Sequence, residues 1–224
     1  MSEISIVYEH VDWWLCDKPA GLGFHNEEDE LGFISVLRAQ LGCDVWPVHR
    51  LDKLTSGLIL VAKSKASCAE LCQLFSERLV EKYYLAICPS TLKKKQGKVA
   101  GDMAKSRRGS YKLLKSHDSP AVTQFFSKSI GSGLRLCLLK PSTGKTHQLR
   151  VALKSLGAAI IGDELYAAKK SDRMYLHAYA LRFNYLDSQY EFILPLNNGE
   201  KFSSPEIEGV LADWNCPWGL SWPK

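Results

Sequence analysis

The segment "HRLDKLTSG" at residues 49–57 sets four ionisable side chains directly before the apolar run "LILVAKS" at residues 58–64. The apolar run predicts a buried β-strand that contains Ile59 and Leu60. Burying a charged side chain is costly unless it is paired or hydrogen-bonded. The ionisable residues are His49, Arg50, Asp52 and Lys53. Such a cluster at the edge of a core is either a structural set of ion pairs or a functional site.

The length and composition are those of a folded protein. The 224 residues suit one large domain, and a content of 46% hydrophobic and 24% charged residues is sufficient for a sizeable core. No apolar run is long enough to span a membrane. The start, "MSEISIVYEH", lacks the basic and apolar parts of a secretory signal. We therefore expect a single domain over residues 1–224, located in the cytoplasm and free of membrane segments.

The cysteines predict neither a disulfide framework nor a zinc site. Their number, seven, is odd, and no Cys-x-x-Cys pair occurs. Cys68 and Cys72 are four residues apart, so they would share one face of a helix. The histidines also lack the spacing of metal ligands. We expect buried, reduced thiols and no bound metal.

Charge is distributed unevenly along the chain, although the net charge is only +5. Residues 1–32 carry eight acidic side chains and one lysine, and residues 186–224 carry six acidic side chains and two lysines. Residues 93–115, in contrast, carry nine basic side chains and one aspartate. This basic segment indicates either a surface for a polyanion or a solvated, lysine-rich loop. We expect it to be an insertion or a mobile loop.

Hydrophobic periodicity predicts strands and helices that do not alternate regularly. Strands are predicted within 4–19, before the turn "KPAGLG", and at 57–64, 82–89, 122–129, 134–142, 174–185 and 190–196. Helices are predicted at 33–42 and 146–157, each ending at a glycine. A third helix is predicted from Ser67, with a capping box between Ser67 and Glu70. Its apolar face would contain Cys68, Leu71, Cys72, Phe75 and Leu79. Because strands outnumber helices, an α+β fold is favoured over a doubly wound parallel sheet.

Several chemistries can be compared with these residues. The segment "STGKT" at 142–146 ends like a phosphate-binding P-loop, but Leu139 stands where that loop needs its first glycine. No Gly-x-Ser-x-Gly elbow occurs. The remaining candidates are Asp52 among basic side chains, His147 and Arg150 on one helix face, and the tyrosines at 83 and 84. A carboxylate beside an arginine stays ionised and can act as nucleophile or base, but a structural ion pair has the same spacing.

A series of motifs in order along the chain resembles the RluA-type family of RNA pseudouridine synthases. The segment at 49–64 resembles the family signature, which is HRLD, two variable residues, TSG and an apolar strand. The segments "DKPAGL" at 17–22, "EKYYLA" at 81–86, "TGKTHQLRVAL" at 143–153, "IIGDELY" at 160–166 and "LHAYALRF" at 176–183 resemble its other blocks. The resemblance covers roughly residues 4–196 and implies the pseudouridine synthase fold. That fold is a mixed, largely antiparallel central sheet, flanked by helices and loops, with a catalytic cleft across its middle.

The resemblance implies isomerisation of a uridine in ribosomal or transfer RNA to pseudouridine, without a cofactor. Asp52 would be the catalytic aspartate, which attacks the flipped uridine at its sugar or promotes elimination there. Tyr84 would stack on the uracil and act when a proton is removed. Arg150 would keep Asp52 ionised and oriented. Arg50 would enter the RNA where the base has left.

The resemblance and the charge pattern together predict the RNA-binding residues. These are Arg50, Lys93, Lys94, Lys95, Arg107, Arg108, Lys145 and His147. Three positions depart from the family pattern, because Lys145 replaces a usual arginine, Ala152 a common histidine and Leu54 a usually polar residue. Lysine keeps the charge but loses the bidentate fork. We expect a monomer without a preceding S4-type RNA-binding domain, so that the catalytic domain itself contacts RNA.

Two other functional classes fit part of the sequence. A non-catalytic RNA-binding protein or RNA chaperone could keep the same scaffold, but binding alone does not require Asp52. A metal-dependent nuclease would need clustered carboxylates, and only isolated acidic residues occur near the motifs.

Overall fold

The computed structural model describes residues 3–28, 30–167, 170–196 and 198–224. Its helices are α1 (Phe33–Leu41), α2 (Lys65–Ser76), α3 (Gln148–Ser155) and α4 (Pro205–Ala212), with 3₁₀ turns at Arg107–Gly109 and Pro217–Gly219. Its strands are β1 (Ser5–Glu9), β2 (Trp13–Lys18), β3 (Trp46–Pro47), β4 (Ser56–Ala62), β5 (Glu81–Pro89), β6 (Gln96–Gly101), β7 (Met103–Lys105), β8 (Tyr111–Leu113), β9 (Ala121–Ser129), β10 (Leu134–Pro141), β11 (Leu176–Tyr185) and β12 (Ser188–Ile193).

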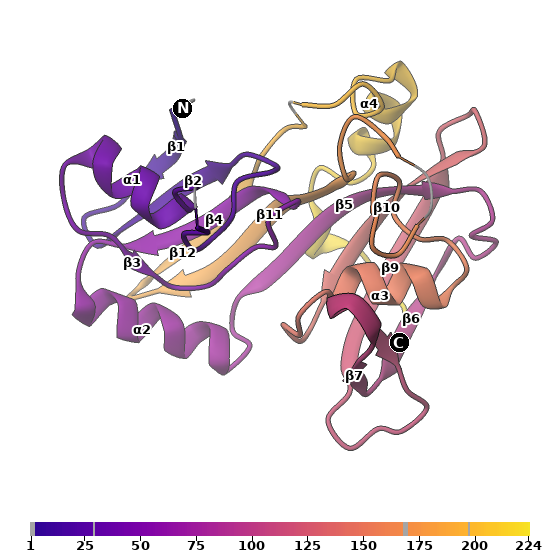
Figure 1. Cartoon of the computed structure of the whole chain (residues 1–224), viewed down its shortest axis with the longest axis horizontal. Coiled ribbons are helices and arrows are strands. Elements are labelled where there is room, and N and C mark those ends of the chain that lie inside the picture. Colours follow the sequence, from indigo (N-terminus) through magenta and orange to yellow (C-terminus); the bar gives the residue numbers. More distant parts are fainter. Residues whose placement is uncertain (1–2, 29, 168–169, 197) are drawn as a thin grey trace.

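One ten-stranded sheet runs through the whole molecule in the order β1-β2-β4-β11-β5-β10-β9-β6, with β12 paired to β11 and β3 to β4 (Figure 1). The strand pairs described in this sheet are antiparallel, except for the parallel pair of β4 and β11. The α+β expectation, with a mixed and largely antiparallel sheet, is therefore confirmed.

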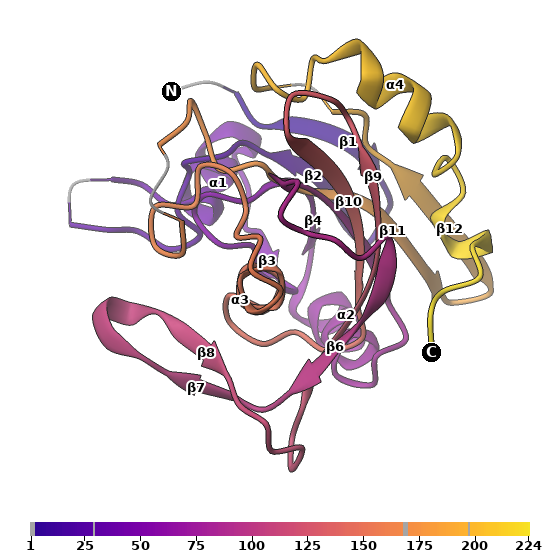
Figure 2. The same ribbon diagram turned by 90° about the vertical axis from the view of Figure 1, so that its right-hand side faces the viewer.

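Two hydrophobic clusters lie side by side along the sheet. One contains α1, α2 and the buried residues of β2 and β4, and the other contains α3, α4 and the buried residues of β5 and β10. Tyr84 on β5 packs against both clusters. Figure 2 shows α3 and the β7–β8 hairpin on one side of the sheet and α4 on the other.

The close approach of β4 to β11 requires a glycine. Gly57, the last residue of the HRLDKLTSG segment, pairs with Ala178 and has a φ of +108°. A Cβ atom at this position would lie 2.3 Å from the Ala178 carbonyl oxygen. Any other residue would push the two strands apart, because both the backbone conformation and the space admit only glycine.

The structure corrects the predicted start and length of the helix after β4. Helix α2 begins at Lys65, and Ser64 is its N-cap. Ser64 Oγ accepts from the Ser67 N–H, and Ser67 Oγ accepts from the Ser64 N–H, so a serine completes the capping box that we expected between Ser67 and Glu70. The helix ends at Ser76, which leaves Leu79 outside it and 55% exposed.

The structure also corrects the interpretation of residues 93–115 as an insertion or mobile loop. Residues 96–101 form β6, which pairs with β9 at one edge of the large sheet, and residues 103–113 form the β7–β8 hairpin. The many lysines obscure the alternation of buried and exposed side chains along β6, in which Val99 is buried. Pairing with β9 stabilises the strand despite its polar composition. The expectation that all thiols are buried is wrong for Cys43 and Cys216, which are exposed. Helix α4 and the short β3, β7 and β8 are additional to the predicted elements.

Candidate active site

Asp52 lies on the loop between β3 and β4. The turn that follows β2 is hydrogen-bonded to this loop. The Asp52 carbonyl accepts from the Thr55 N–H at 3.0 Å, which closes a tight turn. The Lys53 carbonyl accepts from the Gly21 N–H at 2.9 Å and from Lys18 Nζ at 3.1 Å. Lys18 is fully buried and also donates to two carbonyls of its own turn. The segments 17–22 and 49–57 therefore form one rigid unit that presents Asp52.

His49 is structural and neutral, so it is not one of the charged groups of the site. Its Nε2 accepts from the Leu60 N–H at 3.0 Å, and its ring stacks on Phe75 of α2 with centroids 4.4 Å apart. Burial, together with the charge of Lys82, lowers the pKa of His49 to about 3. Lys53 points out of the site and pairs with Glu27 and Glu30 on the surface.

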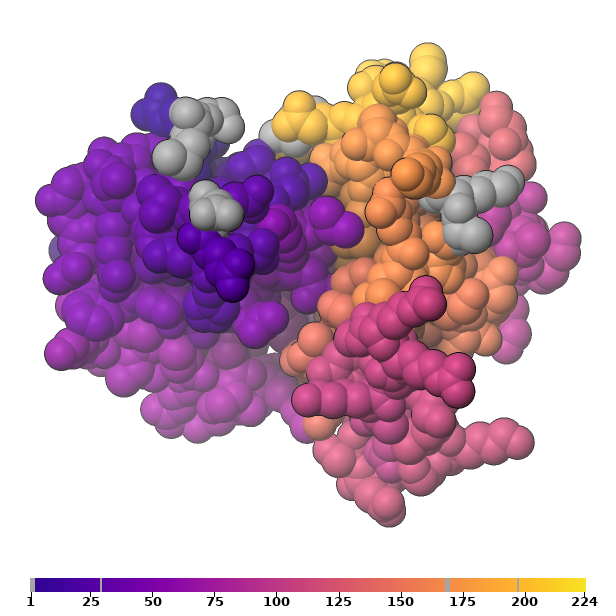
Figure 3. Space-filling view, in the orientation of Figure 1, coloured from indigo at the N-terminus to yellow at the C-terminus, as the bar shows by residue number. Residues whose placement is uncertain are grey.

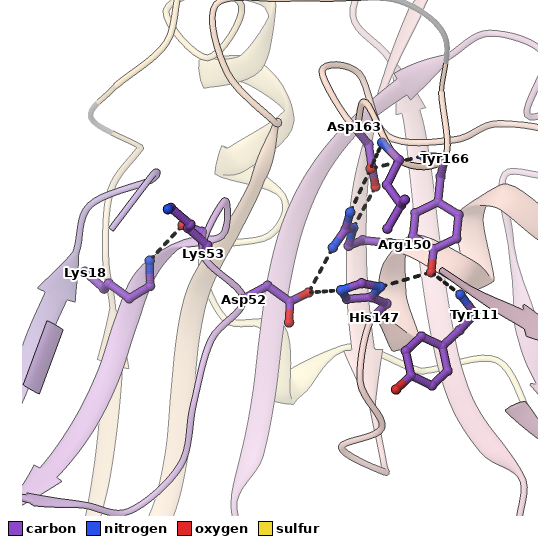
Figure 4. A network of polar contacts seen from close by, with 9 residues as sticks. Lys18, Asp52, Lys53, Tyr111, His147, Arg150, Asp163 and Tyr166 are labelled. Atoms are coloured by element: carbon purple, nitrogen blue, oxygen red, sulfur yellow. Dashed lines mark hydrogen bonds and ion pairs between the residues drawn. The ribbon is translucent and has the colours of Figure 1, made fainter. Parts of the chain in front are cut away.

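Arg150 connects the two halves of the site. It is buried on α3, and its Nε and Nη2 donate to Asp163 at 2.8 and 2.9 Å. The remaining nitrogen, Nη1, donates to Asp52 Oδ2 at 3.4 Å (Figure 4). Asp163 is fully buried and also accepts from backbone N–H groups at 165 and 166. The bidentate pair with Asp163 therefore fixes the guanidinium plane that faces Asp52.

Asp163 owes its position to the glycine before it. Gly162 has a φ of +78°, and a Cβ atom there would lie 1.9 Å from the Arg173 carbonyl oxygen. The sequence alone predicts no role for Asp163, although it lies in the segment "IIGDELY". The sequence signal for such a role is an acidic residue that directly follows a glycine and lies outside the predicted strands. The signal does not identify the partner, Arg150, because Arg150 lies on another element.

His147 stands beside Asp52 and is held by two tyrosines. Its Nε2 lies 4.0 Å from Asp52 Oδ2, and its Nδ1 lies 3.0 Å from the Tyr166 hydroxyl. That hydroxyl accepts from the Tyr111 N–H at 2.7 Å, so its own proton is free to point to His147 Nδ1. Burial and the charge of Arg150 lower the pKa of His147. A neutral imidazole with its proton on Nε2, facing Asp52, follows from these contacts.

A cavity of about 590 Å³ surrounds Asp52, within the usual size of ~300–1,000 Å³ for ligand pockets. Tyr84 and Arg150 line it together with Asp52. One wall comes from the end of α2 and the start of β5, and the other from residues 141–150. Figure 3 shows the hollow between the N-terminal half, coloured indigo to magenta, and the half that contains residues 100–165.

The predicted RNA-binding residues fall into two groups. Arg50, Lys145 and His147 line the cavity, and Lys145 Nζ lies 3.1 Å from Ser119 Oγ. Arg107 and Arg108 form the tip of the β7–β8 hairpin. The ring of Tyr111 in this hairpin packs edge-on against the His147 ring, with the ring centroids 5.5 Å apart.

The lysines at 93–95 lie away from the cavity. The Lys94 and Lys95 carbonyls accept from the Ser127 hydroxyl and N–H. Ser127 is four residues along β9 from Thr123, the partner of Pro141 at the cavity wall. Four residues of a strand span about 13 Å. The basic segment is thus divided between two separate surfaces.

Two departures from the family pattern have a structural setting. Ala152 is 4% exposed and faces the core beneath α3, so it does not touch the cavity. Leu54 is 37% exposed on the loop after Asp52. Within the described residues, no three His, Cys, Asp or Glu side chains are placed to hold a metal ion, and no helix is long and apolar enough to cross a membrane.

Comparison with known proteins defines the class. Residues 12–155 match the family described as RNA pseudouridylate synthase. An uncharacterized RNA pseudouridine synthase of Haemophilus influenzae is 46% identical over 208 residues, which cover 92% of this chain and 93% of that protein. A ribosomal large subunit pseudouridine synthase C of Rickettsia bellii is 38% identical over 184 residues, which cover 77% of this chain and 61% of that protein.

A solved structure shows the same fold. Human RNA Pseudouridylate Synthase Domain Containing 1 has a TM-score of 0.79 and 24% identity, and the match covers 96% of this chain and 95% of that one. The family match and the 46% identical relative define the class, which is that of isomerases that act on RNA. Within it, the chain belongs to the RNA pseudouridine synthase family, of the RluA type.

Proposed function

We propose that this protein converts a specific uridine of RNA to pseudouridine and that Asp52 is the catalytic carboxylate. One observation carries the proposal: the Asp52 carboxylate, 22% exposed, enters a cavity that also contains Tyr84, while Arg150 holds it from the other half of the molecule. A carboxylate fixed in this way is available to a ligand and costs no reorganisation when the ligand arrives.

Asp52 would act at the sugar of a uridine that has left its stack. Attack of the carboxylate on C1′, or removal of a sugar proton by it, breaks the bond between N1 of the uracil and C1′. The freed uracil turns, and a new bond forms between its C5 and C1′. The proton on C5 then leaves, and N1 gains one, so that the product is an isomer of the substrate. Arg150 keeps the Asp52 carboxylate oriented for the first step.

Tyr84 would position the uracil. Burial, and then the negative charge of Asp52, raise the pKa of Tyr84, so its hydroxyl stays protonated at neutral pH. A protonated phenol cannot itself accept the C5 proton. We therefore assign to Tyr84 contact with the uracil ring and orientation of the group that receives that proton, a role that the Asp52 carboxylate in the same cavity could fill.

The substrate would be ribosomal or transfer RNA, and the name of the Rickettsia relative favours ribosomal RNA. Within the cell, the cytoplasm is where such RNA is met. The test is to map pseudouridine in total RNA from cells with and without the gene. We expect at least one site to be lost without the gene and restored when the purified protein is added to that RNA. A map that does not change, together with no conversion by the purified protein, would contradict the proposed function.

A further inference from the structure

The wall of the cavity formed by α2 and β5 carries two cations that the proposed chemistry does not use, Arg78 and Lys82. Lys82 is two residues before Tyr84 on β5, so both side chains lie on the same face of the strand, about 7 Å apart. Two residues lie between Arg78 and the strand, and the second of them, Val80, is buried. Both cations thus lie beside the place assigned to the uracil ring.

Lys82 has no acidic partner among the described residues. Its Nζ lies 5.6 Å from the centre of the Phe75 ring, and its neighbour Glu81 points to the other face, where it pairs with Lys140 and Arg182. Burial lowers the pKa of Lys82, and the charge of Arg78 lowers it further. Two positive side chains therefore lie close together at a cavity, with no described anion between them. Such a pair is stabilised when an anion binds.

The backbone at Arg78 has a conformation that glycine adopts more easily than arginine. The Arg78 N–H donates to the Phe75 carbonyl, and the Leu79 N–H donates to the Leu74 carbonyl, which together form a Schellman motif at the end of α2. Arg78 occupies its left-handed position, with a φ of 62°. Glycine is the usual residue at this position, because other residues are strained there. Strain of this kind is typical of functional sites.

We propose that Arg78 and Lys82 bind a backbone phosphate of the RNA strand that carries the flipped uridine. The proposal rests on the proposed function and adds a second contact to it. Lys145 and His147 form the opposite wall, so the strand would be held from both sides while its base enters between them. The guanidinium of Arg78 can bind two phosphate oxygens, and Lys82 adds a point charge from the same wall.

Arg78→Gly separates this role from a structural one, because the two make opposite predictions. Glycine relieves the strained backbone, so we expect an unchanged melting temperature or a rise of about 2–4 °C. The same variant lacks the cation, so we expect the KM for RNA to rise roughly tenfold. The slope of log K against log salt concentration should fall by roughly 0.7, which corresponds to one lost phosphate contact with single-stranded RNA. Arg78→Lys keeps the strain and the charge but loses the bidentate contact, so its KM should lie between those of wild type and Arg78→Gly. Lys82→Gln should raise the KM in the same way.

The control is Lys154→Gln, which removes an exposed positive charge on α3, away from the cavity. All variants are assayed with total RNA that carries tritium at C5 of uridine, isolated from cells that lack the gene. Unchanged KM and salt dependence for Arg78→Gly would overturn the inference, as would an equal effect of Lys154→Gln. A fall in melting temperature for Arg78→Gly, with KM unchanged, would assign Arg78 to helix stability instead. If wild type releases no tritium, it is the proposed function that fails.

Discussion

At the scale of single residues, the site depends on how Arg150 is shared between two carboxylates. Asp163 takes two of its nitrogens at 2.8 and 2.9 Å, whereas Asp52 receives one at 3.4 Å. The strong pair is buried and the weak one opens into the cavity. Asp163 therefore orients Arg150, and Arg150 in turn orients Asp52 without neutralising it.

Replacement of Arg150 should show this division. Arg150→Leu leaves Asp163 buried and unpaired, so we expect a loss of stability of about 3–5 kcal/mol and no detectable turnover. Arg150→Lys keeps the charge but cannot reproduce the bidentate pair, so we expect a folded enzyme with a lowered kcat. Urea unfolding and tritium release measure the two effects. Full turnover in Arg150→Leu would show that Asp52 needs no oriented partner.

At the scale of elements, the parallel pair of β4 and β11 carries a buried histidine behind the site. Ser56 and His177 are opposite each other, and the His177 Nδ1 lies 2.8 Å from the Ser56 hydroxyl. Arg173 Nη2 donates to the same hydroxyl at 2.6 Å. The contacts suit a neutral imidazole, because the hydroxyl can then donate to Nδ1.

This histidine predicts a pH dependence of stability. Burial, then the charge of Arg173, lower the pKa of His177 to about 4 from 6.5. Between these values the unfolded chain binds a proton that the folded chain does not, so stability falls as the pH is lowered through this window. We expect His177→Asn to reduce the slope between pH 6 and pH 5 by about 1.4 kcal/mol per pH unit, measured by urea unfolding. Equal slopes in the two proteins would mean that His177 is charged in the fold.

The β7–β8 hairpin divides the basic segment and predicts unequal roles for its two parts. Its tip carries Arg107 and Arg108, and its Tyr111 contacts the His147–Tyr166 pair beside Asp52. We expect Arg107→Ala with Arg108→Ala to weaken binding of target and non-target RNA alike, and to lower the salt slope by roughly 0.7 for each phosphate contact with single-stranded RNA. The modified position should not move.

Replacement of Lys93, Lys94 and Lys95 by alanine is the matched comparison. These lysines were also predicted to contact phosphates, and we expect the same kind of effect but a smaller one, because they lie about 13 Å along β9 from the cavity wall. Binding titrations at several salt concentrations separate the two sets. An unchanged slope for the arginine pair would mean that the hairpin faces away from the RNA.

At the scale of the whole molecule, one sheet carries two cores, and the site lies where they meet. Asp52 belongs to the N-terminal half and Arg150 to the other, 98 residues apart in the sequence. The strand at 57–64 was predictable from its apolar run, and Asp52, Tyr84 and Arg150 from the motifs. Asp163, Tyr166 and Arg78 were not, because their roles arise from contacts between elements and from a backbone conformation that no pattern of side chains records.

The same reason explains which elements were misplaced. The sequence predicts a loop at β6, because its lysines obscure an alternation that becomes decisive only once β9 lies beside it. The sequence predicts the N-cap of α2 at Ser67, three residues after the observed N-cap, Ser64. Both serines can act as a cap, and only the packing of the helix selects Ser64.

The measurement that tests the central claim most directly is tritium release by Asp52→Asn. The variant keeps the shape of the side chain and removes its charge, so the loop held by Lys18 should stay in place. RNA labelled with tritium at C5 of uridine reports bond formation at that carbon. We predict that the variant keeps the melting temperature within about 2–4 °C of wild type, still binds the RNA and releases no tritium. Turnover near that of wild type would contradict the account, since the carboxylate of Asp52 would then not be the group that isomerises the uridine.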